Sequence, residues 1–176
     1  MREIVLDTET TGLNKKRCGD ICSGHRIIEI GCVEILDGVL TGNDFHVYVQ
    51  VNQNIDDKAE KIHGITNDFL KDKPFFKDVV DSLLRFIGSS RLIMHNAAFD
   101  IAFLNQEFEL LSEYQRPYGR TFTFLDTLLL ARQKFPGRKN TLDALAKRYG
   151  VGLGRDRNVH GALLDARILA EIYLKL

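Results

Sequence analysis

Carboxylates on faces that are otherwise apolar constrain the fold of this chain more than any other feature. The stretch "IVLDTET" begins as an apolar β-strand and runs directly into Asp7 and Glu9. Alternate residues of a strand share a face, so both acids point the same way as Val5. Two carboxylates on α-carbons about 6.6 Å apart repel each other in a partly buried site unless a cation joins them. The sequence therefore predicts a compensating cation at the end of this strand.

Two predicted helices repeat this feature. Asp100 lies on the stripe formed by apolar residues three, four and eight positions later, and Asp165 shares a stripe with three apolar residues that follow it. A single acid of this kind is more often a hydrogen-bonded core residue, but its recurrence in three elements favours a shared site. Burying four carboxylates is costly unless they surround a divalent cation. Oxygen ligands without cysteine favour two ions of Mg²⁺ or Mn²⁺ over zinc.

A histidine precedes the last of these acids. His160 lies five positions before Asp165, about 140° around a helix, so we expect it at the helix start or in the preceding loop. Imidazole is the side chain that most readily accepts a proton near neutral pH, although a surface or capping histidine is an equally open interpretation. Two cations about 4 Å apart beside a base suit the hydrolysis of a phosphodiester.

The order of predicted elements indicates an α/β fold. Three β-rich segments, residues 3–9, 26–36 and 44–51, are expected to pair largely as hairpins, with the connection 37–44 forming the second turn. Helices and strands then alternate along the chain: helix 75–88, strand 91–96, helix 97–113, strand 121–126, and helices 127–135, 140–149 and 161–176. This order predicts a mixed five-stranded sheet with helices on both faces, formed by residues 1–176 as a single domain.

Composition excludes several classes of protein. No apolar run approaches the eighteen or so residues that span a membrane, and no signal-peptide pattern precedes the first strand, so we expect a cytoplasmic protein without a membrane partner. Cys18, Cys22 and His25 form a grouping that suggests zinc. Because it lacks a fourth ligand and the C-x-x-C spacing, we favour a polar surface loop with free thiols.

The charges balance overall but not locally. With 24 Lys or Arg and 24 Asp or Glu, the whole molecule has no strong attraction for polyanions. The segment from Arg132 to Arg157, however, contains eight basic residues and only two acids. This segment is either a solvated basic face or a strip that guides phosphate groups, and the sequence favours neither.

Three short motifs resemble those of the DEDDh 3′–5′ exonucleases: DTET at 7–10, NAAFD at 96–100 and HGALLD at 160–165. The segments "FHVYV", "IHGIT" and "DTLLLARQKFPGRKNTLDALAKRYG" more narrowly resemble the proofreading epsilon subunits of bacterial DNA polymerase III. The resemblance covers essentially the whole chain, because motif order, spacing and intervening sequence all agree. It implies a ribonuclease-H-like fold, a bacterial cytoplasmic protein, and the removal of 5′-mononucleotides from single-stranded or mismatched DNA 3′ ends.

The resemblance also implies roles for individual residues. Asp7, Glu9 and Asp165 would ligate one metal ion, Asp7 would reach a second ion that Asp100 holds mainly through water, and His160 would be the general base that activates the attacking water.

Further positions match the family's substrate contacts. Five residues would embrace the terminal nucleotide: Thr10, Gly12, Leu13, His63 and Phe99. Leu13 and Phe99 would sandwich its base, in keeping with the stacking typical of single-strand binders, whereas His63 could equally pack a loop. Asp126 also matches a family acid and would support the metal ligands from behind, and His95 would pack.

The partners implied are the DNA 3′ end, the alpha subunit of DNA polymerase III and the sliding clamp. Family members reach the last two through a tail beyond the final helix, which residues 1–176 do not include, so these contacts stay open. The balanced charge is consistent with a domain that receives frayed primer ends from its polymerase.

Three alternatives remain at this point. Residues 7–11 loosely imitate the D-x-D-x-T loop of haloacid-dehalogenase phosphatases, but Glu9 stands where that loop needs Asp. A binding module without catalysis is the second. The third is a DEDDh exoribonuclease that trims RNA 3′ ends, since the choice of sugar does not follow from these residues.

Overall fold

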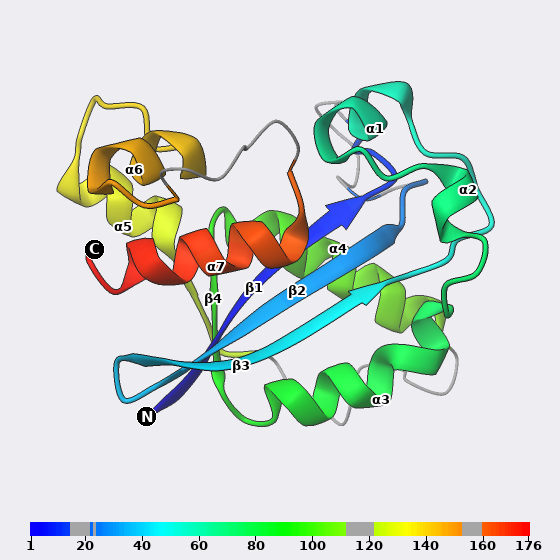
Figure 1. Ribbon diagram of the computed structural model, residues 1–176, viewed down its shortest axis with the longest axis horizontal. Helices are drawn as coiled ribbons and strands as arrows, with labels where there is room; N and C mark the ends of the chain where they lie inside the picture. Colours follow the sequence, from blue (N-terminus) through cyan, green and yellow to red (C-terminus); the bar gives the residue numbers. More distant parts are fainter. Residues whose placement is uncertain (15–21, 23, 112–121, 153–159) are drawn as a thin grey trace.

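A five-stranded sheet in the order β3-β2-β1-β4-β5 lies at the centre of the computed structural model, which describes residues 1–14, 22, 24–111, 122–152 and 160–176 (Figure 1). β1 (Arg2–Thr10) pairs antiparallel with β2 (Ile27–Leu36), which pairs antiparallel with β3 (Val39–Tyr48). On its other side, β1 runs parallel to β4 (Arg91–Met94), and β4 runs parallel to β5 (Phe124–Asp126). The prediction of a mixed five-stranded sheet is confirmed.

The second hairpin is tighter than predicted. Asp37 and Gly38 have φ values of 50° and 78°, and positive φ at both central residues is what a two-residue type I′ turn requires. β3 therefore begins at Val39, and the predicted connection 37–44 is wrong beyond its first two residues. The sequence pattern missed this start because the first five residues of β3 are exposed along the sheet edge and do not alternate.

Seven helices are present in the described residues. Two short ones follow β3 and were not predicted: α1 (Asp57–His63) and α2 (Asn67–Leu70). The other five match predicted segments within a few residues: α3 (Phe76–Ile87), α4 (Ala97–Leu110), α5 (Thr127–Lys134), α6 (Leu142–Tyr149) and α7 (Ala162–Tyr173). The predicted end of helix 97–113 falls at residues 112–113, outside the described residues.

The start of α6 is a second correction. Asn140 was expected to open this helix, but Thr141 is the N-cap, and its hydroxyl accepts a hydrogen bond from the Ala144 amide at 3.3 Å. Asn140 instead donates from Nδ2 to the Phe135 carbonyl at 3.1 Å. Its side chain therefore fixes the turn between α5 and α6.

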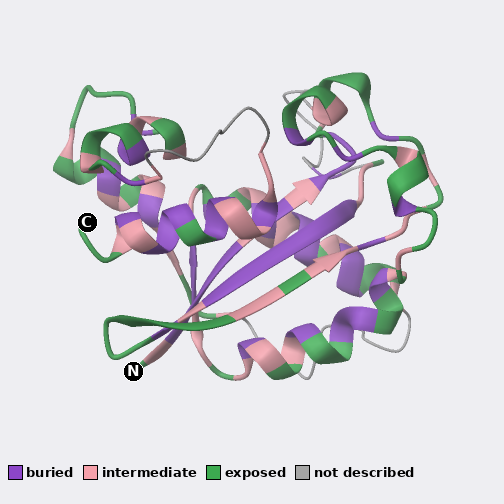
Figure 2. Cartoon of the chain, viewed as in Figure 1, coloured by how far each residue is buried: buried purple, intermediate pink, exposed green. Residues whose placement is uncertain are grey.

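Helices cover both faces of the sheet, as predicted. Ile4 and Leu6 belong to a core cluster with buried residues of α3 and α4, whereas Val5 packs with buried residues of α7. Figure 2 shows β1 and β2 mostly buried between these layers. A Cβ on Gly31 would lie 2.2 Å from the backbone nitrogen of Leu163, so α7 packs directly against β2 at this point. The alternation of β1 thus sends Asp7 and Glu9 toward α7.

Nowhere in the part of the chain that the structure describes does a helix have the length and apolar character needed to cross a membrane.

Candidate active site

The acids singled out by the sequence come together at the carboxyl end of β1. Burial raises the pKa of Asp7 well above its ordinary value, and the charges of Asp100, Glu9, Asp165 and Glu29 raise it further, in that order. Asp7 therefore lies within electrostatic reach of acids from β1, β2, α4 and α7. The convergence predicted from three separate elements is present.

Asp100 is buried and is hydrogen-bonded to β1. The Thr8 hydroxyl donates to Asp100 Oδ1 at 2.8 Å, and the side chain is 3% exposed. Burial raises the pKa of Asp100 to about 7, although the hydrogen bond from Thr8 works in the opposite direction. A carboxyl group with this pKa is partly protonated near neutral pH, and a bound cation would favour its ionised form.

Asp126 fixes the start of the helix that carries Asp100. Its two carboxylate oxygens accept hydrogen bonds from the Asn96 amide at 3.0 Å and the Ala97 amide at 3.2 Å. Asn96 caps α4 in the left-handed conformation, with φ 70°. Asp126 also caps α5 through the Leu128 amide at 2.8 Å. The side chain expected to support the site therefore ties β5, α4 and α5 together behind it.

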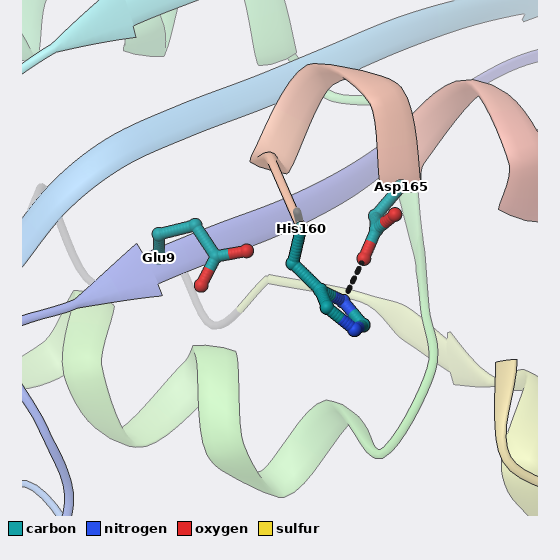
Figure 3. A group of neighbouring side chains, drawn as sticks. All are labelled: Glu9, His160 and Asp165. Carbon is teal, nitrogen blue, oxygen red and sulfur yellow. Dashed lines mark hydrogen bonds and ion pairs between the residues drawn. The ribbon is translucent and has the colours of Figure 1, made fainter. Parts of the chain in front are cut away.

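His160 lies in the segment just before α7, as expected, and turns toward Asp165 (Figure 3). Its Nδ1 is 2.8 Å from Asp165 Oδ2, and its backbone amide donates to the Ile62 carbonyl at 2.9 Å. Single ligand atoms of Glu9, His160 and Asp165 all lie within 4.8 Å of one another. Asp165 is 4% exposed, whereas the His160 side chain is 38% exposed and reachable by solvent.

The chemistry of this donor set fits hard divalent cations. The acids around Asp7 supply carboxylate oxygens, and burial together with mutual repulsion raises its pKa, which a bound cation would reverse. The zinc alternative is not supported: Cys22 is buried in the core and donates from Sγ to the Ala102 carbonyl at 3.6 Å, and Cys18 lies outside the described residues.

A cavity of about 170 Å³ opens beside these carboxylates. All five residues expected to embrace a terminal nucleotide line it: Thr10, Gly12, Leu13, His63 and Phe99. Glu9 lines it too, so the cavity adjoins the metal-type cluster. Leu13 is 41% exposed and Phe99 is half-buried, and both present apolar surface to this space.

Gly12 has a steric reason to be glycine. Its φ is 150°, and a Cβ there would lie 2.6 Å from Asp56 Oδ2 and 2.7 Å from His25 Cε1. The Thr10 hydroxyl donates to the Gly12 carbonyl at 2.9 Å and holds this turn against β1. The turn therefore forms one wall of the cavity without side-chain bulk.

His63 ends α1 with its ring in the cavity wall. Its Nδ1 accepts a hydrogen bond from the Ile65 amide at 3.0 Å, and the side chain is 5% exposed. Nε2 makes no hydrogen bond of normal geometry within the described residues, although the Thr10 carbonyl lies close enough to raise the pKa of the ring. Burial lowers the pKa of His63, so the neutral ring is favoured.

His95 packs beneath the site, as expected. Its Nε2 donates to the Asn140 carbonyl at 2.9 Å, and its Nδ1 lies 2.9 Å from Thr127 Oγ1. Burial lowers the pKa of His95, so the ring is a neutral link between β4, α5 and the turn before α6.

Sequence reasoning missed a fifth acid. Glu29 on β2 pairs in register with Glu9, is 2% exposed, and lies 2.7 Å from His46 Nε2. A Cβ on Gly161 would approach its carboxylate at 3.8 Å, so Glu29 lies below the start of α7. Its position in the apolar run "RIIEIGCV" was a usable signal of burial, although not of the direction in which its side chain points. The cavity residues Asp56, Lys58, Ala59 and Ile62 were also missed, because α1 was not predicted.

The carboxylates that meet at the end of the central strand, together with the family and the solved structures that match, define the class of this protein: a nuclease of the ribonuclease-H-like fold. The chain belongs to the Exonuclease (RNase T) family, which matches residues 4–173. The expectation of a 3′–5′ exonuclease is confirmed. This membership removes the support for a phosphatase of another fold.

Curated relatives support membership of this family. The chain is 52% identical to "DNA polymerase III subunit epsilon" of Buchnera aphidicola subsp. Acyrthosiphon pisum, over 98% of this chain and 71% of the relative. It is 49% identical to the protein of the same name from Escherichia coli K12, over 99% of this chain and 71% of the relative. The Rickettsia prowazekii protein of that name is 48% identical, over 100% of this chain and 74% of the relative.

Solved structures agree in fold. Exonuclease X in complex with 5′ overhanging duplex DNA superposes with a TM-score of 0.71 and 27% identity, over 98% of this chain and 89% of that chain. The nuclease domain of 3′hExo, described as a DEDDh family member, superposes with a TM-score of 0.76 over 99% of this chain and 90% of that one. At 19% identity, the second likeness concerns the fold alone.

Proposed function

We propose that this chain removes nucleoside 5′-monophosphates one at a time from the 3′ end of single-stranded or mismatched DNA, as the proofreading exonuclease of a bacterial replicative polymerase. The main support for this function is the cluster of Glu9, His160 and Asp165 beside a cavity lined by the five residues expected to contact the nucleotide. The polymerase subunits named among the relatives support DNA as the substrate. Residues 1–176 would form one catalytic domain.

The carboxylates would hold two divalent cations, Mg²⁺ or Mn²⁺. Asp7, Glu9 and Asp165 would ligate one, and Asp7 and Asp100 the other, with Asp126 keeping α4 in place. Bound there, such ions lower the pKa of a water and stabilise the charge on the leaving oxygen. The protein's own contribution is to position these oxygens before the substrate arrives, through Thr8 for Asp100 and through the first turn of α7 for Asp165.

His160 would take the proton from the attacking water. A neutral ring that donates from Nδ1 to Asp165 keeps its lone pair on Nε2, and that atom would be the acceptor. The hydrogen bond from its amide to Ile62 joins this base to α1, the helix that lines the nucleotide cavity. A backbone hydrogen bond thus links the base to the wall of the nucleotide cavity.

The cavity would receive only the terminal nucleotide. Leu13 and Phe99 offer apolar surface for stacking, which tolerates any base. Thr10 and the turn at Gly12 would lie against the sugar, and His63 would offer a ring nitrogen to it. Such a site reads the freed 3′ end rather than the sequence, as removal of mismatched termini requires.

The partners proposed are the DNA 3′ end and the polymerase that supplies it. The relatives' names support a DNA polymerase III complex as the setting, and we extend the proposal to its alpha subunit and to the sliding clamp.

A comparison of 5′-labelled DNA and RNA oligomers, each with a matched or mismatched 3′ end on a template, tests this function. We expect shortening of DNA by single nucleotides with Mg²⁺ or Mn²⁺, faster at mismatched ends and abolished by chelator. The variant Asp7→Asn should be inactive while folded, whereas Asp72→Asn, an exposed acid on the same chain, should match the wild type. Preferential shortening of RNA would favour the exoribonuclease alternative, and inactivity of the wild type on both would refute the proposal.

A further inference from the structure

Exposed cations are concentrated in one part of the molecule. It is formed by α5, the turn after it and α6, and we refer to its six exposed basic residues as the basic face: Arg132, Lys134, Arg138, Lys139, Lys147 and Arg148. Between residues 127 and 152, Asp143 is the sole acid. Because basic and acidic residues are equal in number over the whole chain, the rest of the chain carries the compensating excess of acids. The net charge of the chain is therefore zero, although the electrostatic potential over the basic face is strongly positive.

Two members of the basic face are built into the fold. The Arg148 guanidinium donates to Asn140 Oδ1 at 3.1 Å and to the Lys139 carbonyl at 3.0 Å, and it stacks 4.3 Å above the centre of the Phe135 ring. Lys134 Nζ donates to the Leu176 carbonyl at 2.7 Å. The Arg148 contacts support the turn between α5 and α6, and the Lys134 contact joins α5 to the residues after α7, so the remaining cations project from a well-packed base.

The basic face is joined to the active site through His95. The Asn140 carbonyl accepts the hydrogen bond from His95 Nε2, and His95 immediately precedes Asn96, the cap of the helix that carries Asp100. Burial lowers the pKa of His95 most, and the nearby charge of Arg132 adds to this, which places Arg132 within electrostatic reach. The basic face therefore begins at the edge of the sheet where the carboxylates meet.

The direction of the substrate strand indicates that its upstream nucleotides lie on the side of the molecule formed by α5 and α6. Removing a 3′-terminal nucleotide as its 5′-monophosphate breaks the ester on the 5′ side of that nucleotide's phosphate. With the nucleotide in the cavity beside α1 and its phosphate at the carboxylates, the next nucleotides must lie beyond the carboxylates. In Figure 1, α1 is at the upper right, α5 and α6 are at the upper left, and the start of α7 lies between them.

We propose that the basic face binds backbone phosphates of the substrate strand upstream of the nucleotide being removed. The inference rests on the proposed function for the direction of the strand. Contacts of this kind add affinity without reading sequence, which suits an enzyme that must accept any primer end. They would also explain how a chain whose charges balance over its full sequence can still bind a polyanion.

The test removes three exposed cations that the packing of the turn does not use through their side chains: Arg138→Gln, Lys139→Gln and Lys147→Gln combined. The matched control removes three exposed cations, one that follows α2 and two from α3: Lys71→Gln, Lys77→Gln and Arg85→Gln. Steady-state hydrolysis is measured with a single-stranded DNA oligomer over a range of salt concentrations. It is measured in parallel with the p-nitrophenyl ester of thymidine 5′-monophosphate, which fills the cavity and the carboxylate site but has no upstream phosphates.

We expect the basic-face variant to raise KM for the oligomer about tenfold or more at low salt, and to reduce the salt slope of log(kcat/KM) by about two, since single strands contribute about 0.7 per neutralised phosphate. Hydrolysis of the thymidine ester should remain at the wild-type rate, and the control variant should resemble the wild type on both substrates.

An unchanged KM and salt slope for the basic-face variant, with a wild type active on both substrates, would overturn this inference alone and leave the face to an acidic protein partner. Equal losses on the oligomer and the ester would also overturn it, because the ester cannot reach the basic face. A wild type inactive on both substrates would instead refute the proposed function.

Discussion

Replacing Asp100 by Asn should stabilise the metal-free protein at alkaline pH while abolishing its activity. The pKa of Asp100 is raised to about 7 from an ordinary value of 3.8, chiefly by burial. A carboxyl whose folded pKa is raised contributes stability that is fully present below its unfolded pKa and is lost as pH rises through the folded pKa. The stability that Asp100 contributes to the metal-free protein is therefore lost between about pH 4 and about pH 7.

The magnitude follows from the size of that shift. Each pKa unit corresponds to about 1.4 kcal/mol, so ionised Asp100 costs the metal-free fold up to about 4 kcal/mol at pH 8. Asn removes this cost and weakens the hydrogen bond from Thr8, worth about 1 kcal/mol. The net gain of about 3 kcal/mol corresponds to a rise in Tm of about 6 to 12 °C for a chain of this size. Loss of the repulsion between Asp100 and Asp7 acts in the same direction.

Thermal unfolding with chelator at pH 5 and pH 8 measures this effect. The variant should have a higher Tm than the wild type at pH 8 and a similar one at pH 5, where the wild-type carboxyl is protonated. Adding Mn²⁺ at pH 8 should stabilise the wild type more than the variant. A lower Tm for the variant at pH 8 in chelator would refute the reasoning that this acid is strained without a cation.

Three further predictions concern other parts of the site. Gly31→Ala should destabilise the protein by about 3 kcal/mol in urea unfolding, because its methyl group would press on the backbone of Leu163, and a loss below about 0.5 kcal/mol would contradict that contact. His160→Gln should lower kcat about 10²- to 10³-fold with little change in KM or Tm, and a KM effect alone would argue against a proton acceptor. Glu29→Gln should weaken Mn²⁺ binding about tenfold by calorimetry, and His46→Gln, which removes the partner of that acid, should strengthen it. If both variants changed the affinity for Mn²⁺ in the same direction, the pair would be purely structural.

The buried acids were predictable because periodicity is a local property of the sequence. Asp165 could be assigned to the apolar face of its helix from the spacing of its neighbours, and the structure buries it there. His160 could be placed before the helix because five positions cannot share one helical face. The resemblance to a known family then supplied the nucleotide contacts, which no periodicity would reveal.

The features that were missed depend on tertiary structure. Glu29 lies in a strand that is buried on both faces, so its neighbours do not alternate and give no sign of which way it points. The short helix α1 carries few apolar residues, and its packing rather than its propensity sets it against the end of β1. The start of β3 was obscured because the exposed edge strand lacks a buried face to mark it.

Counting bound Mn²⁺ by calorimetry shows whether the acids brought together around Asp7 form a site for two divalent cations. The titration uses chelator-stripped protein with thymidine 5′-monophosphate present to fill the cavity. We expect two ions per wild-type chain and loss of both in Asp7→Asn. Unchanged Mn²⁺ binding by that variant, or none by the wild type, would contradict this expectation.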